Sequence, residues 1–158
     1  MQVFTAQKKT LSMRVKNGVT FIELLVVVVI IGAIAIPLLI TYRTYRTSQA
    51  LATSSEAVAN NIRSAHIFAR EARSQREWGV KNLDPQMYAL YSTGASGEVI
   101  EQRYSLASGV QFEKDFNILF TIGTGEADTN YEINLINTTG TETRISISEI
   151  GAVEVLRL

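Results

Sequence analysis

The sequence of 158 residues contains no cysteine, one histidine and two prolines. Without cysteine there is no disulfide bond, no thiolate metal ligand and no cysteine nucleophile. The single histidine, His66, has no partner residue at the spacing of a zinc site. Neither a nucleophile elbow nor a phosphate-binding glycine loop is present. We therefore expect no catalytic residues, no metal site and no cofactor.

Charge is unevenly distributed along the chain, although the formal net charge is +0. Positions 1–18 contain four basic residues and no acidic one, whereas positions 82–158 contain eleven acidic residues and four basic ones. Proteins whose main task is to bind nucleic acid usually carry a net basic domain. The acidic C-terminal part therefore makes nucleic acid an unlikely main partner.

A long apolar run occupies positions 19–40, where Glu23 is the one charged residue. At about 1.5 Å per residue, a helix of this length spans roughly 33 Å, which is enough to cross the hydrocarbon core of a bilayer. Basic residues precede the run, and the next one is Arg43. The positive-inside rule then puts positions 1–18 in the cytoplasm and the rest of the chain on the other side of the membrane.

Glu23 is unusual within such a run, because a carboxylate near the bilayer centre costs about 2.5–3.5 kcal/mol and commonly has a partner or a function. A conventional secretory signal has a shorter apolar region with its cleavage site behind it. Here a small-residue boundary, Gly18-Val19, precedes the run instead. Cleavage there would create an amine one helical turn from Glu23, in the same chain or in a neighbour. The alternative is an interfacial Glu23 that snorkels or stays protonated.

The segment Gly18-Val19-Thr20-Phe21-Ile22-Glu23, with its basic leader and apolar run, resembles the class III signal of type IV pilins and type II secretion pseudopilins. The resemblance implies that prepilin peptidase cuts between Gly18 and Val19 and methylates Val19. It also implies that Glu23 acts in filament assembly. The expected partners are prepilin peptidase, other pilin or pseudopilin subunits, the inner-membrane assembly platform and membrane lipid.

Two residues are expected to make the apolar helix flexible during assembly. Pro37 removes one backbone hydrogen bond and kinks or loosens a helix. It lies earlier than the helix proline of many pilins, so the flexible section is expected to be shifted. Gly32 is expected to add to this flexibility.

Positions 41–78 continue as an amphipathic helix that we expect to pack against the C-terminal part. The predicted end of this helix is Trp78-Gly79, where glycine can take the left-handed cap. A cluster of arginines near its end complements the helix dipole. The cluster could alternatively contact DNA, although such a strip is usually a solvated face. The apolar stripe consists of Leu51, Val58, Ile62, Ala65, Ala69 and Ala72, and the basic cluster of Arg63, Arg70, Arg73 and Arg76.

Apolar and polar residues alternate in short runs over positions 79–158, which predicts a β-rich head. We expect an antiparallel sheet that the helix covers on one side, and therefore an α+β fold. The order of these short apolar runs resembles the GspH/FimT group of minor pseudopilins. The expected strands are 86–91, 99–106, 117–121, 131–136, 144–148 and 152–156.

Two polar segments of the head have alternative interpretations. The segment 123–128 could offer oxygens to calcium, but its spacing is not that of an EF-hand, so we expect a plain acidic turn. Asn137-Thr138-Thr139 matches a glycosylation acceptor, a tripeptide that arises often by chance.

The sequence thus predicts four parts: a cleaved leader at 1–18, a membrane-spanning and later filament-core helix at 19–40, an amphipathic helix at 41–78 and a β-rich head at 79–158. The expected function is that of a structural subunit, a minor pseudopilin of a type II secretion pseudopilus or type IV pilus. The alternatives are a major pilin, an anchored binding module that never polymerises, and an exported enzyme with an uncleaved anchor.

Overall fold

The computed structural model of the protein describes residues 19–158, so the expected leader and Gly18 lie outside the described residues. The chain divides into two compact units, Met1–Leu39 and Ile40–Leu158. Helix α1, Phe21–Arg70, begins in the first unit and ends in the second. Each unit is described by itself below.

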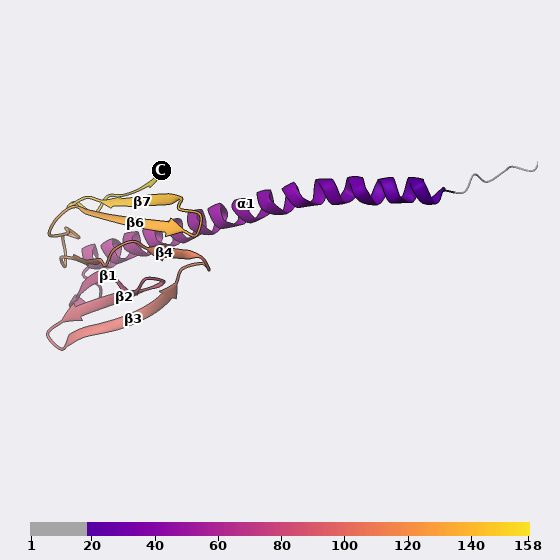
Figure 1. The fold of residues 1–158 in the computed structure, drawn as a ribbon. Coiled ribbons are helices and arrows are strands. Elements are labelled where there is room, and N and C mark those ends of the chain that lie inside the picture. Colours follow the sequence, from indigo (N-terminus) through magenta and orange to yellow (C-terminus); the bar gives the residue numbers. More distant parts are fainter. Residues whose placement is uncertain (1–18) are drawn as a thin grey trace, which may run out of the picture. The chain divides into compact units, whose positions relative to one another are not determined.

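The second unit contains two four-stranded antiparallel sheets beside the C-terminal part of α1 (Figure 1). One sheet has the order β3-β2-β1-β5 and the other the order β4-β6-β7-β8. The expected α+β class is confirmed, with two sheets where the sequence indicated one. The strands are β1 Glu77–Asp84, β2 Met87–Gly94, β3 Gly97–Ser105, β4 Val110–Phe112, β5 Asn117–Phe120, β6 Tyr131–Asn137, β7 Glu142–Ile147 and β8 Val153–Arg157.

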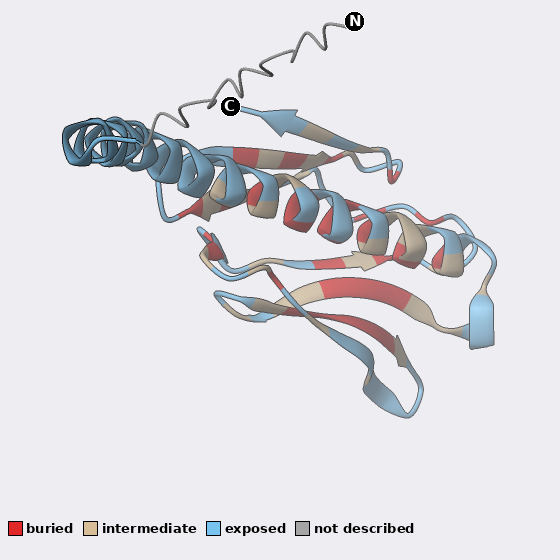
Figure 2. Cartoon of the chain, turned by 90° about the vertical axis from the view of Figure 1, so that its right-hand side faces the viewer, coloured by how far each residue is buried: buried red, intermediate tan, exposed pale blue. Residues whose placement is uncertain are grey.

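The apolar stripe of the helix forms one side of the core, and Figure 2 shows its buried residues facing both sheets. Ile62 is fully buried, and it belongs to one cluster with Val80 and Leu90 of the first sheet and Leu135 of the second. Burying a side chain of this size contributes about 1.5–3 kcal/mol. Five predicted stripe residues are buried: Leu51, Val58, Ile62, Ala65 and Ala69.

Helix α1 ends at Arg70, so the predicted end at Trp78-Gly79 is wrong, and both of those residues lie in β1. The last turn is closed from elsewhere in the sequence. The carbonyl of Ala69 accepts hydrogen bonds from the N–H of Ala72 at 3.0 Å and of Gly123 at 2.8 Å. A cap supplied by a distant loop leaves no local signal, which is why the sequence pointed to the nearest glycine instead. Ala72 consequently lies beyond the helix rather than on its stripe.

The chain leaves the helix through three non-glycine residues with positive φ, Ala72 at 49°, Ser74 at 59° and Gln75 at 52°. This conformation costs roughly 1–2 kcal/mol for an ordinary residue. Side chains hold the turn in place, since the indole Nε1 of Trp78 donates to the carbonyl of Arg73 at 3.0 Å. The guanidinium of Arg73 also lies 4.4 Å from the ring centroid of Phe68.

We expect Ala72→Gly to raise the free energy of unfolding by about 1 kcal/mol, because glycine removes the left-handed strain. Urea unfolding followed by the fluorescence of Trp78, the one tryptophan in the sequence, measures the change. The opposite change is expected for Ala69→Gly inside the helix, which should lower stability by about 1 kcal/mol through helix propensity and further through the loss of a buried methyl group. A loss of stability in Ala72→Gly would contradict the assigned strain.

Strand β1 was not predicted from the sequence, although it is a central strand of its sheet. It contains Gly79, which pairs with Tyr91 on one side and Leu119 on the other. A methyl group at position 79 would overlap the carbonyl oxygen of Ile118 and would lie 2.7 Å from the Tyr91 ring. Gly79 is therefore present for close approach within the sheet, and not to end a helix.

Tyr91 covers this glycine with its ring and remains a neutral phenol. Burial, followed by the carboxylate of Glu98, raises the pKa of Tyr91 to about 12. Its hydroxyl donates to Oδ1 of Asn117 at 2.7 Å. The ring thus covers Gly79 on the face of the first sheet that points away from the core cluster.

Candidate functional site: the N-terminal segment of helix α1

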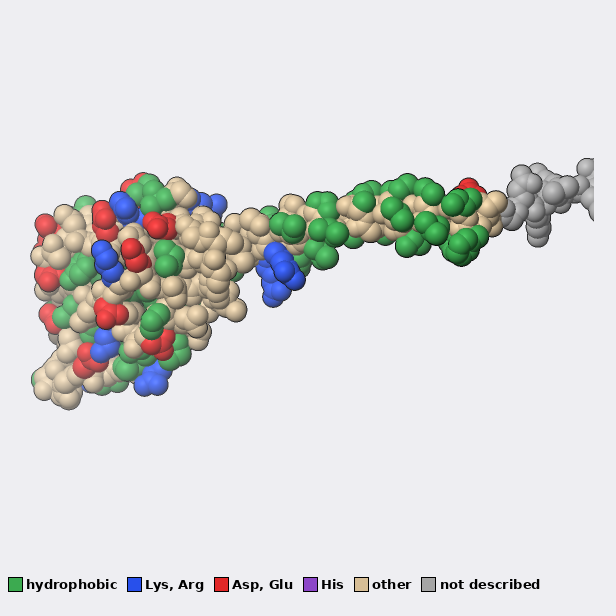
Figure 3. Space-filling view, viewed as in Figure 1, with side chains coloured by type: hydrophobic (Ala, Val, Ile, Leu, Met, Phe, Trp, Pro, Cys, Tyr) green, Lys and Arg blue, Asp and Glu red, His purple; other side chains and the backbone are tan. Residues whose placement is uncertain are grey.

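The N-terminal segment of α1 has apolar side chains on all of its faces. Its large apolar residues, from Val19 to Ile40, keep 46–80% of their surface exposed. Figure 3 shows the hydrophobic side chains that cover this part of the helix. Within residues 19–158, α1 is the single helix that is both long enough and apolar enough to span a membrane. A helix that is apolar all round requires lipid or other protein around it.

A polar cap starts the helix. The hydroxyl oxygen of Thr20 accepts a hydrogen bond from the N–H of Glu23 at 3.3 Å, and the Thr20 carbonyl accepts one from Leu24 at 3.1 Å. Thr20 is therefore the N-cap, and Glu23 is the third helical residue, which is the spacing and one of the two hydrogen bonds of a capping box. A carboxylate in the first turn also interacts favourably with the helix dipole. The Thr-x-x-Glu spacing could have revealed this cap from the sequence.

The expected site residues of this segment lie at the start of α1 or within its N-terminal part. Val19 and Thr20 precede the helix, and Glu23 lies in its first turn. Gly32 and Pro37 are both inside the helix, and a side chain at position 32 would meet no atom within 4 Å. The roles of these residues in cleavage, methylation, assembly and flexibility stay predictions.

Two polar contacts fix the C-terminal part of α1 to other segments of its own unit. The hydroxyl of Ser54 accepts from the N–H of Ala107 at 3.0 Å. Nδ2 of Asn61 donates to the hydroxyl of Tyr88 at 2.8 Å. Ser54 is buried although it was not part of the predicted stripe. Its hydrogen-bond partner, Ala107, is distant in the sequence, so no local pattern indicates this burial.

The expected basic cluster does not form one solvent-facing strip. Arg63 donates to the carbonyl of Val153 at 3.0 Å. Arg73 lies over Phe68, and Arg76 donates to the hydroxyl of Ser92 at 3.2 Å. Three of the four arginines therefore have partners within their own unit. Arg70 remains exposed in the last turn of the helix.

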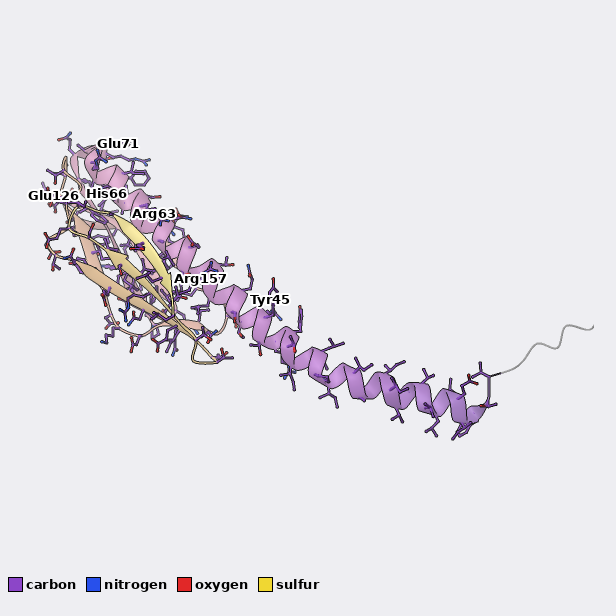
Figure 4. All side chains as sticks on the ribbon, turned by 90° about the horizontal axis from the view of Figure 1, so that it is seen from above. Tyr45, Arg63, His66, Glu71, Glu126 and Arg157 are labelled. Carbon is purple, nitrogen blue, oxygen red and sulfur yellow. The ribbon has the colours of Figure 1, made fainter. Side chains whose placement is uncertain are left out.

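His66 lies on α1 beneath two loops that contain Gly125 and Gly151 (Figure 4). Side chains at these two glycines would overlap the imidazole. The His66 ring meets Phe120 edge-on, with centroids 5.5 Å apart. Burial, and then the charge of Arg70, lowers the pKa of His66 below its ordinary value of 6.5. The imidazole is thus a half-buried packing element.

This lowered pKa predicts a pH-dependent stability. Because the unfolded chain binds the proton more readily than the folded one, the free energy of unfolding should fall as the pH drops through 6.5. Urea unfolding at about pH 7.5 and about pH 5.5 measures this loss. His66→Gln should remove this contribution, whereas an equal pH dependence in that variant would contradict it.

The two polar segments of the head have structural roles. In the acidic turn, Thr121 N–H donates to the Glu126 carbonyl at 2.9 Å, and Asp128 accepts from the Tyr131 hydroxyl at 2.6 Å. No cluster of three metal-ligating side chains is found within residues 19–158. The Asn137 side chain is buried, and its Oδ1 accepts from the N–H groups of Thr139 and Thr141. Asn137 therefore closes the turn between β6 and β7.

Comparisons with known proteins found similarity in the N-terminal segment and in the fold. A family model described as the prokaryotic N-terminal methylation motif matches residues 13–39. That match spans the predicted cleavage boundary and Glu23. The N-terminal part of the chain therefore carries the pattern of a known methylation motif. No curated protein matches the chain significantly.

The solved structures of similar fold include two of the minor pseudopilin EpsH from the type II secretion system of Vibrio cholerae. The first is 17% identical with a TM-score of 0.55, covering 68% of this chain and 96% of that chain. The second is 13% identical with a TM-score of 0.55, covering 70% and 95%. At these identities the similarity concerns the fold.

Proposed function

We propose that the protein is a minor pseudopilin, a structural subunit of a type II secretion pseudopilus. The observation that carries the proposal is the segment from Phe21 to Ile40, which is apolar on every face and has one carboxylate, Glu23, in its first turn. The methylation motif and the EpsH-like fold support it from the two parts of the chain.

The proposed life of the subunit has two stages. It is first a single-pass protein of the bacterial inner membrane, with its leader in the cytoplasm and its head in the periplasm. Prepilin peptidase then cuts between Gly18 and Val19 and methylates Val19. The inner-membrane assembly platform transfers the subunit into the filament, where neighbouring subunits replace lipid around the apolar segment. Gly32 and Pro37 supply flexibility for this transfer.

Glu23 selects the register of assembly in this proposal. The amine of a neighbouring subunit's N-terminus pairs with the Glu23 carboxylate in the low-dielectric core of the filament. Leaving one member of a buried ion pair without its partner costs about 3–5 kcal/mol. A subunit in the wrong register is therefore penalised, although the pair itself adds little net stability.

Mass spectrometry of the mature protein from its native membrane tests the processing. The expected N-terminus is Val19, heavier by one methyl group. An intact Met1, or a cut within or behind the apolar run as in a conventional secretory signal, would refute the proposed maturation. Sheared filaments separate a minor from a major subunit, because a major pilin would be their most abundant protein.

A further inference from the structure

A basic groove lies on the second unit, just after the apolar segment ends. Arg43, Arg46 and Thr47 of α1 line it opposite Ser108, which precedes β4, and Thr138 and Thr139, which follow β6. Its volume is about 530 Å³. Nothing in the proposed assembly through Glu23 uses these residues.

The groove offers hydrogen-bond donors and no acidic side chain. Arg43 and Arg46 are exposed, and neither guanidinium makes an ion pair or hydrogen bond among the described residues. The hydroxyls of Ser108 and Thr138 are likewise without a hydrogen-bond acceptor in the described part of the chain. Two guanidinium groups beside two free hydroxyls match the oxygens of a phosphate.

The position of the groove along the helix indicates that the nearest phosphate groups would be those of lipid headgroups. Arg43 follows Ile40, the last large apolar residue of the exposed segment, by about 4.5 Å of helix rise. Tyr42 and Tyr45 alternate with the two arginines and are 63% and 66% exposed. Tyrosine is enriched at the interface between lipid and water, and arginine near a helix end extends towards the headgroups.

We propose that Arg43 and Arg46, with the hydroxyls of Ser108 and Thr138, bind the phosphate of an anionic phospholipid at the outer surface of the inner membrane. This inference rests on the proposed function, because it requires the segment from Phe21 to Ile40 to lie in the bilayer. Bound lipid fixes this end of the head at the headgroup layer until the subunit leaves the membrane.

Native mass spectrometry of the full chain in mild detergent tests the site. Phosphatidylglycerol, phosphatidylcholine and inorganic phosphate are each added as probes. We expect selective retention of one phosphatidylglycerol. The double variant Arg43→Gln/Arg46→Gln should lower this affinity about 30-fold, at about fivefold per arginine near a membrane surface. Arg70→Gln, which removes the same charge from the far end of the helix, should leave it unchanged.

The outcomes separate this inference from its alternatives. Equal retention of both lipids, or unchanged selectivity in the double variant, overturns it. Displacement of the lipid by millimolar phosphate assigns the groove to a free anion and overturns the lipid assignment. Normal lipid selectivity with lost self-association in the double variant assigns the arginines to a contact between subunits. Arg46→Lys, which keeps the charge, should weaken binding only slightly and guards against misfolding of the double variant.

The same full-length protein distinguishes failure of the proposed function from failure of the lipid site alone. A full chain that does not enter phosphatidylcholine nanodiscs contradicts membrane anchoring itself. A chain that enters them without preferring phosphatidylglycerol contradicts only the lipid site. Trp78 fluorescence confirms that each variant keeps its folded head.

Discussion

Glu23→Ala is expected to leave membrane insertion intact and to abolish incorporation into filaments. The substitution makes the apolar segment more hydrophobic, so insertion should not suffer. In the filament, however, the neighbouring N-terminal amine would lose its partner at about 3–5 kcal/mol per contact. Membrane fractionation measures the first effect, and the amount of the protein in sheared filaments measures the second.

Two further variants make the Glu23 result specific. Glu56→Ala removes an exposed carboxylate from the same helix and should assemble normally. Glu23→Gln keeps the shape of the side chain and the backbone N–H that Thr20 caps, while it removes the charge. Assembly of Glu23→Gln at the wild-type level would show that assembly does not require the charge of this side chain, and would contradict the ion pair.

Gly79→Ala is expected to destabilise the head by about 3 kcal/mol or more, because β1 is held between two strands and has no room for a methyl group. Urea unfolding followed by Trp78 fluorescence measures the effect. The added methyl would overlap a backbone oxygen of β5, which cannot rotate away as a side chain can.

A comparison of glycines controls this result. Gly97→Ala meets no atom within 4 Å but has a φ of 95°, so it should cost about 1 kcal/mol through strain alone. Tyr91→Ala removes the ring over Gly79 but leaves the Ile118 carbonyl in place. If Tyr91→Ala restores the stability of Gly79→Ala, the backbone clash is not the cause.

The apolar stripe could be predicted because its cause is local. Leu51, Val58 and Ile62 follow the helical period, and each is buried. The burial of Ser54 could not be predicted, because it depends on a hydrogen bond to Ala107. Likewise, the helix ends at Arg70 because Gly123 supplies a distant N–H, and no spacing in the sequence reports that contact.

The strands show the same division between local and distant causes. Six expected strands were found close to their expected positions, since alternation marks a half-buried strand. β1 was missed because Trp78 and Gly79 resemble a helix end, whereas the glycine serves a close contact with Tyr91. β4 contains only three residues, which are too few for alternation to stand out.

The candidate site divides in this way too. The motif from Gly18 to Glu23 is contiguous, so it is visible in the sequence and matched by the family model. The basic groove is not, because Arg43, Ser108 and Thr138 come from three separate segments that only the fold brings together.

The contact between Arg63 and the carbonyl of Val153 covers part of an open strand edge. β8 is the last strand of its sheet, so one of its sides lacks a neighbouring strand. Open strand edges on proteins at high local concentration invite cross-pairing and aggregation. Figure 4 shows Arg63 beside the C-terminal strands, where its guanidinium occupies an edge carbonyl at 3.0 Å. The long helix thus also protects part of this edge against pairing with a strand of another protein.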